Sequence, residues 1–127
     1  GVQTCALPIC LQEMLNANPS VVFFRLLSGN EGPIGALNVP LTDEASAAVD
    51  PKFVPLGSPI YLSTTRPNDS EPMNRLIQAQ DTGGAIAGPI RVDYFWGFGT
   101  KAGEMAGRMK QKGQVWLLWP KGAELPK

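Results

Sequence analysis

Residues 74–97 read NRLIQAQDTGGAIAGPIRVDYFWG, in which two apolar runs flank a glycine-rich segment. The runs at residues 74–80 and 90–96 have the length and the apolar, aromatic content typical of strands. The segment between them, residues 81–89, is too rich in glycine for a regular element. The stretch therefore predicts two strands joined by an irregular loop, with Asp81 at the loop's first position and Asp93 within the second strand.

Short apolar runs bounded by turn residues continue on both sides of this stretch. Further strands are predicted at residues 45–50 (ASAAVD), 58–64 (SPIYLST) and 114–120 (QVWLLWP). The segments between them supply proline, glycine and Asx turns. Short strands at this spacing favour a mostly β protein, either a barrel or a sandwich.

Two short helices are expected. The first lies at residues 11–16 (LQEMLN), and the second interrupts the strands. Thr100 is a suitable N-cap, and Gly113 is a suitable stop for a helix of that length. The apolar residues between them recur at helical spacing and share one face: Ala102, Met105, Ala106 and Met109.

Composition limits the class of protein. With 127 residues, 43% of them apolar, the chain has the material for one domain or part of one. Eleven basic and eleven acidic residues cancel, which argues against a nucleic-acid partner. There is no histidine, and the two cysteines lie within the first ten residues, so we predict no metal site, no histidine-based triad and no cofactor. The longest apolar stretches fall short of the roughly 20 residues that cross a bilayer.

The chain's opening differs from the rest. Residues 1–10, GVQTCALPIC, have neither the basic start nor the long apolar run of a secretory signal, and we interpret them as a non-native start. The chain itself reads as a fragment. We predict one domain over residues 11–122 and a tail over 123–127.

Three aspartates follow apolar runs and precede turns: Asp50, Asp81 and Asp93. For Asp50 and Asp81 the simplest explanation is that each accepts backbone N–H groups of the following turn. Asp93 stands among large apolar residues, and burial there would favour the protonated carboxyl that a general acid requires. Arg91 could oppose this by pairing with Asp81 or Asp93. A surface aspartate beside core aromatics is the alternative.

Aromatic residues beside Asp93 have two explanations. Tyr94 and Trp96 would share one side of their strand, where they could stack on a sugar ring or simply form core. In a small β domain the second is the more frequent. The glycines of the loop, Gly83, Gly84 and Gly88, match no nucleotide-binding motif, and they could let backbone N–H groups approach a ligand or adopt positive φ.

Several runs together resemble the membrane-bound lytic murein transglycosylase A family: NANPSVVFFR, GPIGALNVPLT, AAVDPKFVPLGSPIYL and the whole of residues 79–120. The ordered aspartates match the signature of that family's C-terminal "3D" domain. The resemblance implies a double-psi β-barrel, of which this chain would supply the second half. It also implies a separate inserted domain, with glycan bound in the groove between the two.

The resemblance also implies an activity. The family cleaves the β-1,4 bond between N-acetylmuramic acid and N-acetylglucosamine without water, which leaves a 1,6-anhydro sugar. Asp93 would be the single acid and base, with Asp81 and Asp50 in supporting roles. The residues expected to bind substrate are Thr82, Gly83, Gly84, Ala85, Tyr94 and Trp96. Ala87 departs from the pattern, where a basic residue is expected, so a contact to a stem peptide or sugar carboxyl is in doubt.

The implied partner is a peptidoglycan glycan strand, and the implied location is the periplasmic face of the bacterial outer membrane. Contact with the membrane would be made only through a lipid anchor upstream of this chain. The sequence carries no indication of an oligomeric state.

Two other functions share this fold. One is a secreted muralytic 3D-domain protein without the inserted domain. The other is a non-catalytic, expansin-like glycan-binding module in which Asp93 orients sugar without cleaving it. A barrel whose aspartates only cap loops is the remaining alternative.

Overall fold

The structure is a computed structural model that describes residues 16–17 and 32–125. Its elements, in chain order, are β1 (Ser46–Val49), β2 (Pro59–Thr65), β3 (Pro72–Asp81), β4 (Val92–Tyr94), α2 (Thr100–Arg108) and β5 (Gln114–Leu117). Each strand predicted between residues 45 and 120 is present, although β4 and β5 are shorter than their apolar runs. None of the helices in the described ranges has the length and apolar character to cross a membrane.

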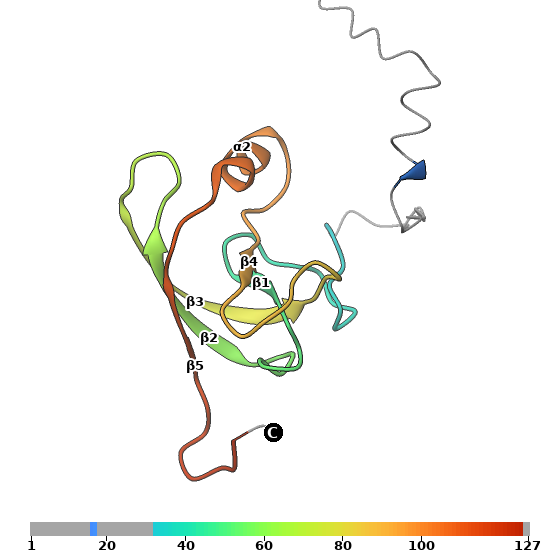
Figure 1. Ribbon diagram of the computed structural model, residues 1–127, viewed down its shortest axis with the longest axis vertical. Helices are drawn as coiled ribbons and strands as arrows, with labels where there is room; N and C mark the ends of the chain where they lie inside the picture. Colours follow the sequence, from blue (N-terminus) through green and yellow to red (C-terminus); the bar gives the residue numbers. More distant parts are fainter. Residues whose placement is uncertain (1–15, 18–31, 126–127) are drawn as a thin grey trace, which may run out of the picture.

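The strands form one curved sheet in the order β4-β1-β3-β2-β5. The pair β1 and β3 is parallel, and the other neighbours are antiparallel. Figure 1 shows the sheet curling into a half barrel, with α2 and the β2–β3 turn at the same end. The predicted mostly β class is therefore confirmed.

The core lies on the concave face of this sheet. In β2, Ile60 and Leu62 are buried while Tyr61 between them is exposed, which is the alternation expected of a half-buried strand. The buried apolar side chains of the described residues are Ala47, Val49, Val54, Ile60, Leu62, Met73, Ile77, Ala79, Tyr94 and Trp96. We refer to the opposite, solvent-facing side of the sheet as the outer face.

A β-bulge near the end of β3 decides which face Asp81 occupies. Ala47 pairs with Ala79, but the next residue of β1, Ala48, pairs with Asp81, so Gln80 is the extra residue. Regular alternation from buried Ala79 would turn Asp81 to the core face. The bulge instead places it beside Ala48 on the outer face, and this one residue sets the geometry of the candidate site.

The helix differs from the prediction at both ends. Its N-cap is Gly99, and Thr100 makes no side-chain cap. It ends at Arg108 because Met109 adopts an extended backbone and accepts a hydrogen bond at Sδ from Trp96 Nε1, at 3.1 Å. Gly113 is not the stop; a Cβ there would lie 2.7 Å from the Ser63 carbonyl oxygen, so this glycine allows β5 to approach β2. Of the four residues predicted to share one face, Ala102, Met105 and Met109 pack against the core, whereas Ala106 is exposed.

Part of the predicted domain division lies outside the described residues. This holds for residues 1–10, for residues 11–15 and 18–31 of the predicted domain, and for the last two residues of the tail. The division into residues 1–10, 11–122 and 123–127 stays a prediction.

Candidate functional site

Asp81 and Asp93 lie on either side of one small residue. Ala48 of β1 pairs with Asp81 of β3 and with Asp93 of β4. Residues paired across neighbouring strands point to the same face, so the two carboxylates stand in one row on the outer face. With β1 between their strands, their Cα atoms are about 10 Å apart.

Arg91 holds the carboxylate of Asp93. Its Nε donates to Oδ1 at 2.9 Å and its Nη2 to Oδ2 at 3.1 Å, so the pair is bidentate. The two side chains are 48% and 45% exposed. The hydrogen bond to Asp93, and then its charge, raise the pKa of Arg91. Both carboxylate oxygens therefore have a cationic partner.

The prediction that Asp93 is buried among apolar neighbours is wrong. Strand alternation turns Tyr94 to the core and Asp93 to solvent, so adjacency in the sequence does not become contact. The argument from burial for a protonated carboxyl therefore does not apply in this structure. Arg91, which could have paired with either aspartate, pairs with Asp93.

Asp81 has a different partner from the one predicted. Its Oδ1 accepts the backbone N–H of Ala36 at 3.1 Å, across 45 positions of sequence, rather than that of the following turn. This bond attaches the loop of residues 32–41 to the end of β3. Asp81 was also predicted to hold Asp93 and the glycine loop, residues 82–91, and that role stays a prediction. The bonds that hold this loop, described below, come from Asp50 and Arg91.

Asp50 does bond to the turn that follows it, as predicted, and also reaches further. Its Oδ1 accepts the N–H of Lys52 at 3.0 Å, and its Oδ2 accepts the N–H of Gly88 at 2.8 Å. These two bonds, that of Gly88 first, lower the pKa of Asp50, and burial opposes them. Gly88 has φ of 98°, which only glycine adopts readily. Asp50 thus fixes the C-terminal part of the glycine loop through Gly88.

The glycine loop, residues 82–91, is tied at three points. Asp50 holds Gly88, and Arg91 donates from Nη1 to the Ala85 carbonyl oxygen at 2.6 Å. Within the loop the N–H of Ile86 donates to the Gly83 oxygen at 2.8 Å. Thr82, Gly84 and Ala85 remain exposed, and Gly83 is half-buried. The predicted substrate-binding segment is therefore an accessible and braced loop between the two aspartates.

Tyr94 and Trp96 are core residues. Their ring centroids are 4.9 Å apart in an edge-to-face arrangement, and the Tyr94 hydroxyl donates to the Glu44 carbonyl oxygen at 2.8 Å. Burial raises the pKa of Tyr94, and the charge of Glu44 adds to the shift. Of the two explanations that the sequence left, core packing fits both residues, and their assignment as a sugar platform is not supported by their burial.

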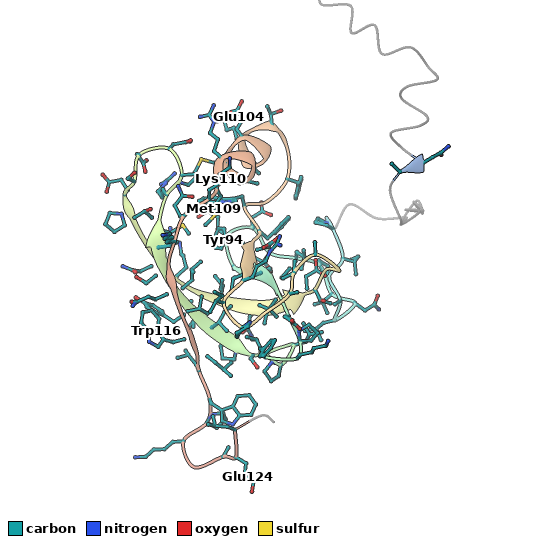
Figure 2. The ribbon with its side chains drawn as sticks, in the orientation of Figure 1. Tyr94, Glu104, Met109, Lys110, Trp116 and Glu124 are labelled. Atoms are coloured by element: carbon teal, nitrogen blue, oxygen red, sulfur yellow. The ribbon has the colours of Figure 1, made fainter. Side chains whose placement is uncertain are left out.

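The pockets on the half barrel differ in whether they border the aspartates. One of about 400 Å³ lies beside Asp93, between β4 and the end of α2, and Arg91, Met109 and Lys110 also line it. Figure 2 shows Met109, Lys110 and Tyr94 at this end of the half barrel. A second, of about 500 Å³, is lined by residues 55–59 and 118–120, is mostly apolar and has no acidic or basic side chain. Of the three aspartates, Asp93 lines the first pocket, and Asp50 and Asp81 line neither.

Sequence reasoning missed one tether of the loop and left the partner of Arg91 open between Asp81 and Asp93. The bond from Gly88 to Asp50 joins positions 38 residues apart, and no local pattern indicates it. The Arg91–Asp93 pair had a signal, because residues two apart on a strand share a face.

Replacement of Asp50 by Asn is expected to destabilise the fold mainly near neutral pH. An amide has one acceptor atom, so one of two N–H groups loses its partner. Because folding lowers the pKa of Asp50, its carboxylate stabilises the fold above the unfolded-state pKa, about 3.9, and the effect is lost as pH falls through the folded value. Thermal unfolding of the complete protein should show a Tm lower by a few degrees at pH 7 and a smaller difference at pH 3. Asp69→Asn, at an exposed turn, is the matched control; equal shifts would contradict the assignment.

Comparison with known proteins identifies the domain. A family model described as the 3D domain matches residues 45–119, a segment that holds Asp50, Asp81 and Asp93. The chain belongs to the 3D domain family.

This 3D domain is similar to part of larger proteins. It is 37% identical over 114 residues to membrane-bound lytic murein transglycosylase A of Escherichia coli K12, covering 85% of the chain and 30% of that relative. The crystal structure of MltA from Neisseria gonorrhoeae matches 93% of the chain with a TM-score of 0.80 and 49% identity, over 30% of its own length. That of E. coli MltA with bound chitohexaose matches 87% of the chain with a TM-score of 0.73 and 34% identity, over 34% of its length.

These similarities confirm the resemblance to the membrane-bound lytic murein transglycosylase A family and the predicted fold, the second half of a double-psi β-barrel. The chain spans about 30% of the length of the curated relatives it matches.

Proposed function

We propose that the complete protein containing this chain is a peptidoglycan lytic transglycosylase. It would cleave the β-1,4 bond between N-acetylmuramic acid and N-acetylglucosamine without water and leave a 1,6-anhydro end. The observation that carries the proposal is the row Asp93–Ala48–Asp81 beside the braced glycine loop, in a chain 49% identical to a crystallised MltA.

Asp93 is the proposed acid and base. As an acid it protonates the glycosidic oxygen that leaves, and as a carboxylate it then takes the proton of the C6 hydroxyl that attacks C1. The internal hydroxyl is present at a high effective concentration, so no second carboxylate is needed to activate water. Each oxygen of Asp93 accepts one bond from the guanidinium and keeps a second lone pair, so the carboxyl group can carry the proton while Arg91 holds it.

The surroundings of Asp93 support a ligand with many hydroxyl groups. Thr82, Gly84 and Ala85 are exposed beside it, and their backbone groups offer donors and acceptors that carry no charge. Arg91 bonds both to Asp93 and to the Ala85 carbonyl oxygen of this loop, so a sugar that contacts the loop is held in a fixed position relative to Asp93. Chitohexaose, a chain of amino sugars, is the ligand bound to the related E. coli MltA.

We assign the complete protein to the bacterial periplasm and propose a lipid anchor upstream of this chain that fixes it to the outer membrane. The name of the E. coli relative, which describes it as membrane-bound and as acting on murein, supports this location. Peptidoglycan is then the partner within reach.

The test uses the complete protein and purified peptidoglycan sacculi, with the released muropeptides identified by mass spectrometry. Anhydro products, lighter than hydrolysed ones by one water, are expected. Reducing-end products would instead identify a hydrolase and require a second base. Binding to sacculi with no product at all would favour the expansin-like module.

A further inference from the structure

Three large side chains form a row on the outer face, away from the core. Tyr61 of β2 pairs with Leu76 of β3 on one side and with Trp116 of β5 on the other. They are 39%, 61% and 46% exposed, and the two aromatic rings are 5.7 Å apart at 49°. Figure 2 shows Trp116 projecting on the side of β5 away from Tyr94 and Met109. We call Leu76, Tyr61 and Trp116 the aromatic strip.

Uncharged hydrogen-bonding groups border the aromatic strip. Asn74 and Gln114 lie in register with Ser63 on one side, and Gln78 lies two residues beyond Leu76 on the other. Asn74, Gln78 and Gln114 are exposed, and each offers both donors and an acceptor. Aromatic faces flanked by amides and a hydroxyl suit a ligand with apolar faces and hydroxyl or amide edges, which describes an N-acetylated pyranose. Neither the strip nor its border carries a charge that would select an ionic ligand.

The strip and the row of aspartates lie on the same face of the sheet. The bulge at Gln80 turns Asp81 outward, and Leu76 already points outward five residues earlier on β3. Five residues of strand span about 16 Å. Asp93 lies about 10 Å further, across β1, so a glycan of several sugars is long enough to reach from the strip to Asp93, whereas one or two sugars are not. Between them the outer face is covered at Ser46, which is fully buried and accepts the N–H of Thr42. A glycan that reaches both has to pass this segment, so the length of the path favours a polymeric sugar as the occupant.

We propose that the aromatic strip is a second glycan-binding site, which takes neutral N-acetylated sugars of a strand whose scissile bond lies at Asp93. The proposal rests on the proposed function and extends it, because it makes productive binding depend on glycan length. Cross-strand aromatic pairs also stabilise sheets, so the test has to separate sugar binding from folding.

The test measures the Kd for two ligands, chitohexaose and chitobiose, by calorimetry on the complete protein carrying Asp93→Asn to prevent turnover. Tyr61→Val and Trp116→Val keep a strand-forming β-branched residue and remove the ring. We expect each to weaken binding of chitohexaose about tenfold, the loss of a single well-placed aromatic contact, and to leave chitobiose unchanged. Trp116→Phe retains a ring and should retain most of the affinity. Phe53→Val removes a half-exposed aromatic ring outside the strip and should change neither Kd.

An unchanged Kd for chitohexaose in both valine variants would overturn the proposal. This is also the result expected if other parts of the complete protein cover the aromatic strip. Equal losses for both ligands, or losses that follow a lower Tm, would also overturn it. The two proposals fail separately. If sacculi yield no anhydro products while the length-dependent loss persists, the strip binds glycan in a protein that is not a transglycosylase.

Discussion

Asp93→Asn in the complete protein is expected to abolish anhydro-muropeptide formation while leaving the fold intact. The amide cannot donate and recover the proton that the proposed reaction moves, and general acid–base catalysis contributes about 10²–10⁴-fold to a rate. The amide oxygen of the variant can still accept one bond from Arg91, and position 93 is exposed, so no buried group loses its partner. Product analysis by mass spectrometry on sacculi, together with the Tm, gives both readouts.

Asp81→Asn is the informative comparison. An amide side chain at position 81 can still accept the Ala36 N–H through its single oxygen, so loop attachment is preserved while the charge is lost. If one carboxyl is sufficient, this variant should keep forming anhydro products at a reduced rate. Loss of activity as complete as in Asp93→Asn, with reducing-end products from the wild type, would instead indicate a two-carboxylate hydrolase. Retained turnover in Asp93→Asn would remove Asp93 from the chemistry altogether.

Local pattern predicted the strands but not the face of every residue. The alternation in β2 is carried by neighbouring residues, so the sequence alone locates Ile60 and Leu62 in the core. The bulge at Gln80 depends on the pairing of β3 with β1, and no property of residues 78–81 announces it. Asp81 reaches the row with Asp93 only through that bulge, so this part of the site required the tertiary structure.

The environment of Asp93 shows a second limit of sequence reasoning. Its flanking residues are large and apolar, yet a strand sends its immediate neighbours to the opposite face, where Tyr94 joins the core. Residues at i+2, not i+1, share an environment on a strand. Applied consistently, that rule predicts Arg91 as the neighbour of Asp93 and Tyr94 as the partner of Trp96, and both contacts are present.

The C-terminal end of α2 was predicted wrongly for a different reason. Gly113 had the composition of a helix stop, but Met109 leaves the helix four residues earlier, where its sulfur meets Trp96. A tertiary contact therefore overrode the local signal. The same glycine is required instead by the close approach of β5 to Ser63.

Arg91→Ala is expected to lower kcat on peptidoglycan by about 10²-fold and to change KM little. Arg91 fixes both oxygens of Asp93 and, through its third nitrogen, the Ala85 carbonyl at 2.6 Å. Without it the carboxylate rotates freely and the loop loses one tether, and a displacement of about 1 Å in such a group costs about 10²-fold. Arg91 is thus a positioning residue, which acts through Asp93 and the loop.

The conservative variant separates positioning from charge. Lysine keeps the positive charge but, as a point donor, cannot form two parallel bonds to Asp93 while also reaching Ala85, so Arg91→Lys should recover only part of kcat. Arg66→Ala, which removes an exposed arginine 3.8 Å from Asp69, is the matched control and should leave kcat unchanged. Wild-type kcat in Arg91→Ala would contradict the assignment, and a rise would mean that Arg91 restrains Asp93 rather than positions it. If kcat falls together with the Tm, and Arg91→Lys restores no part of kcat at unchanged stability, Arg91 has a structural role in the fold instead.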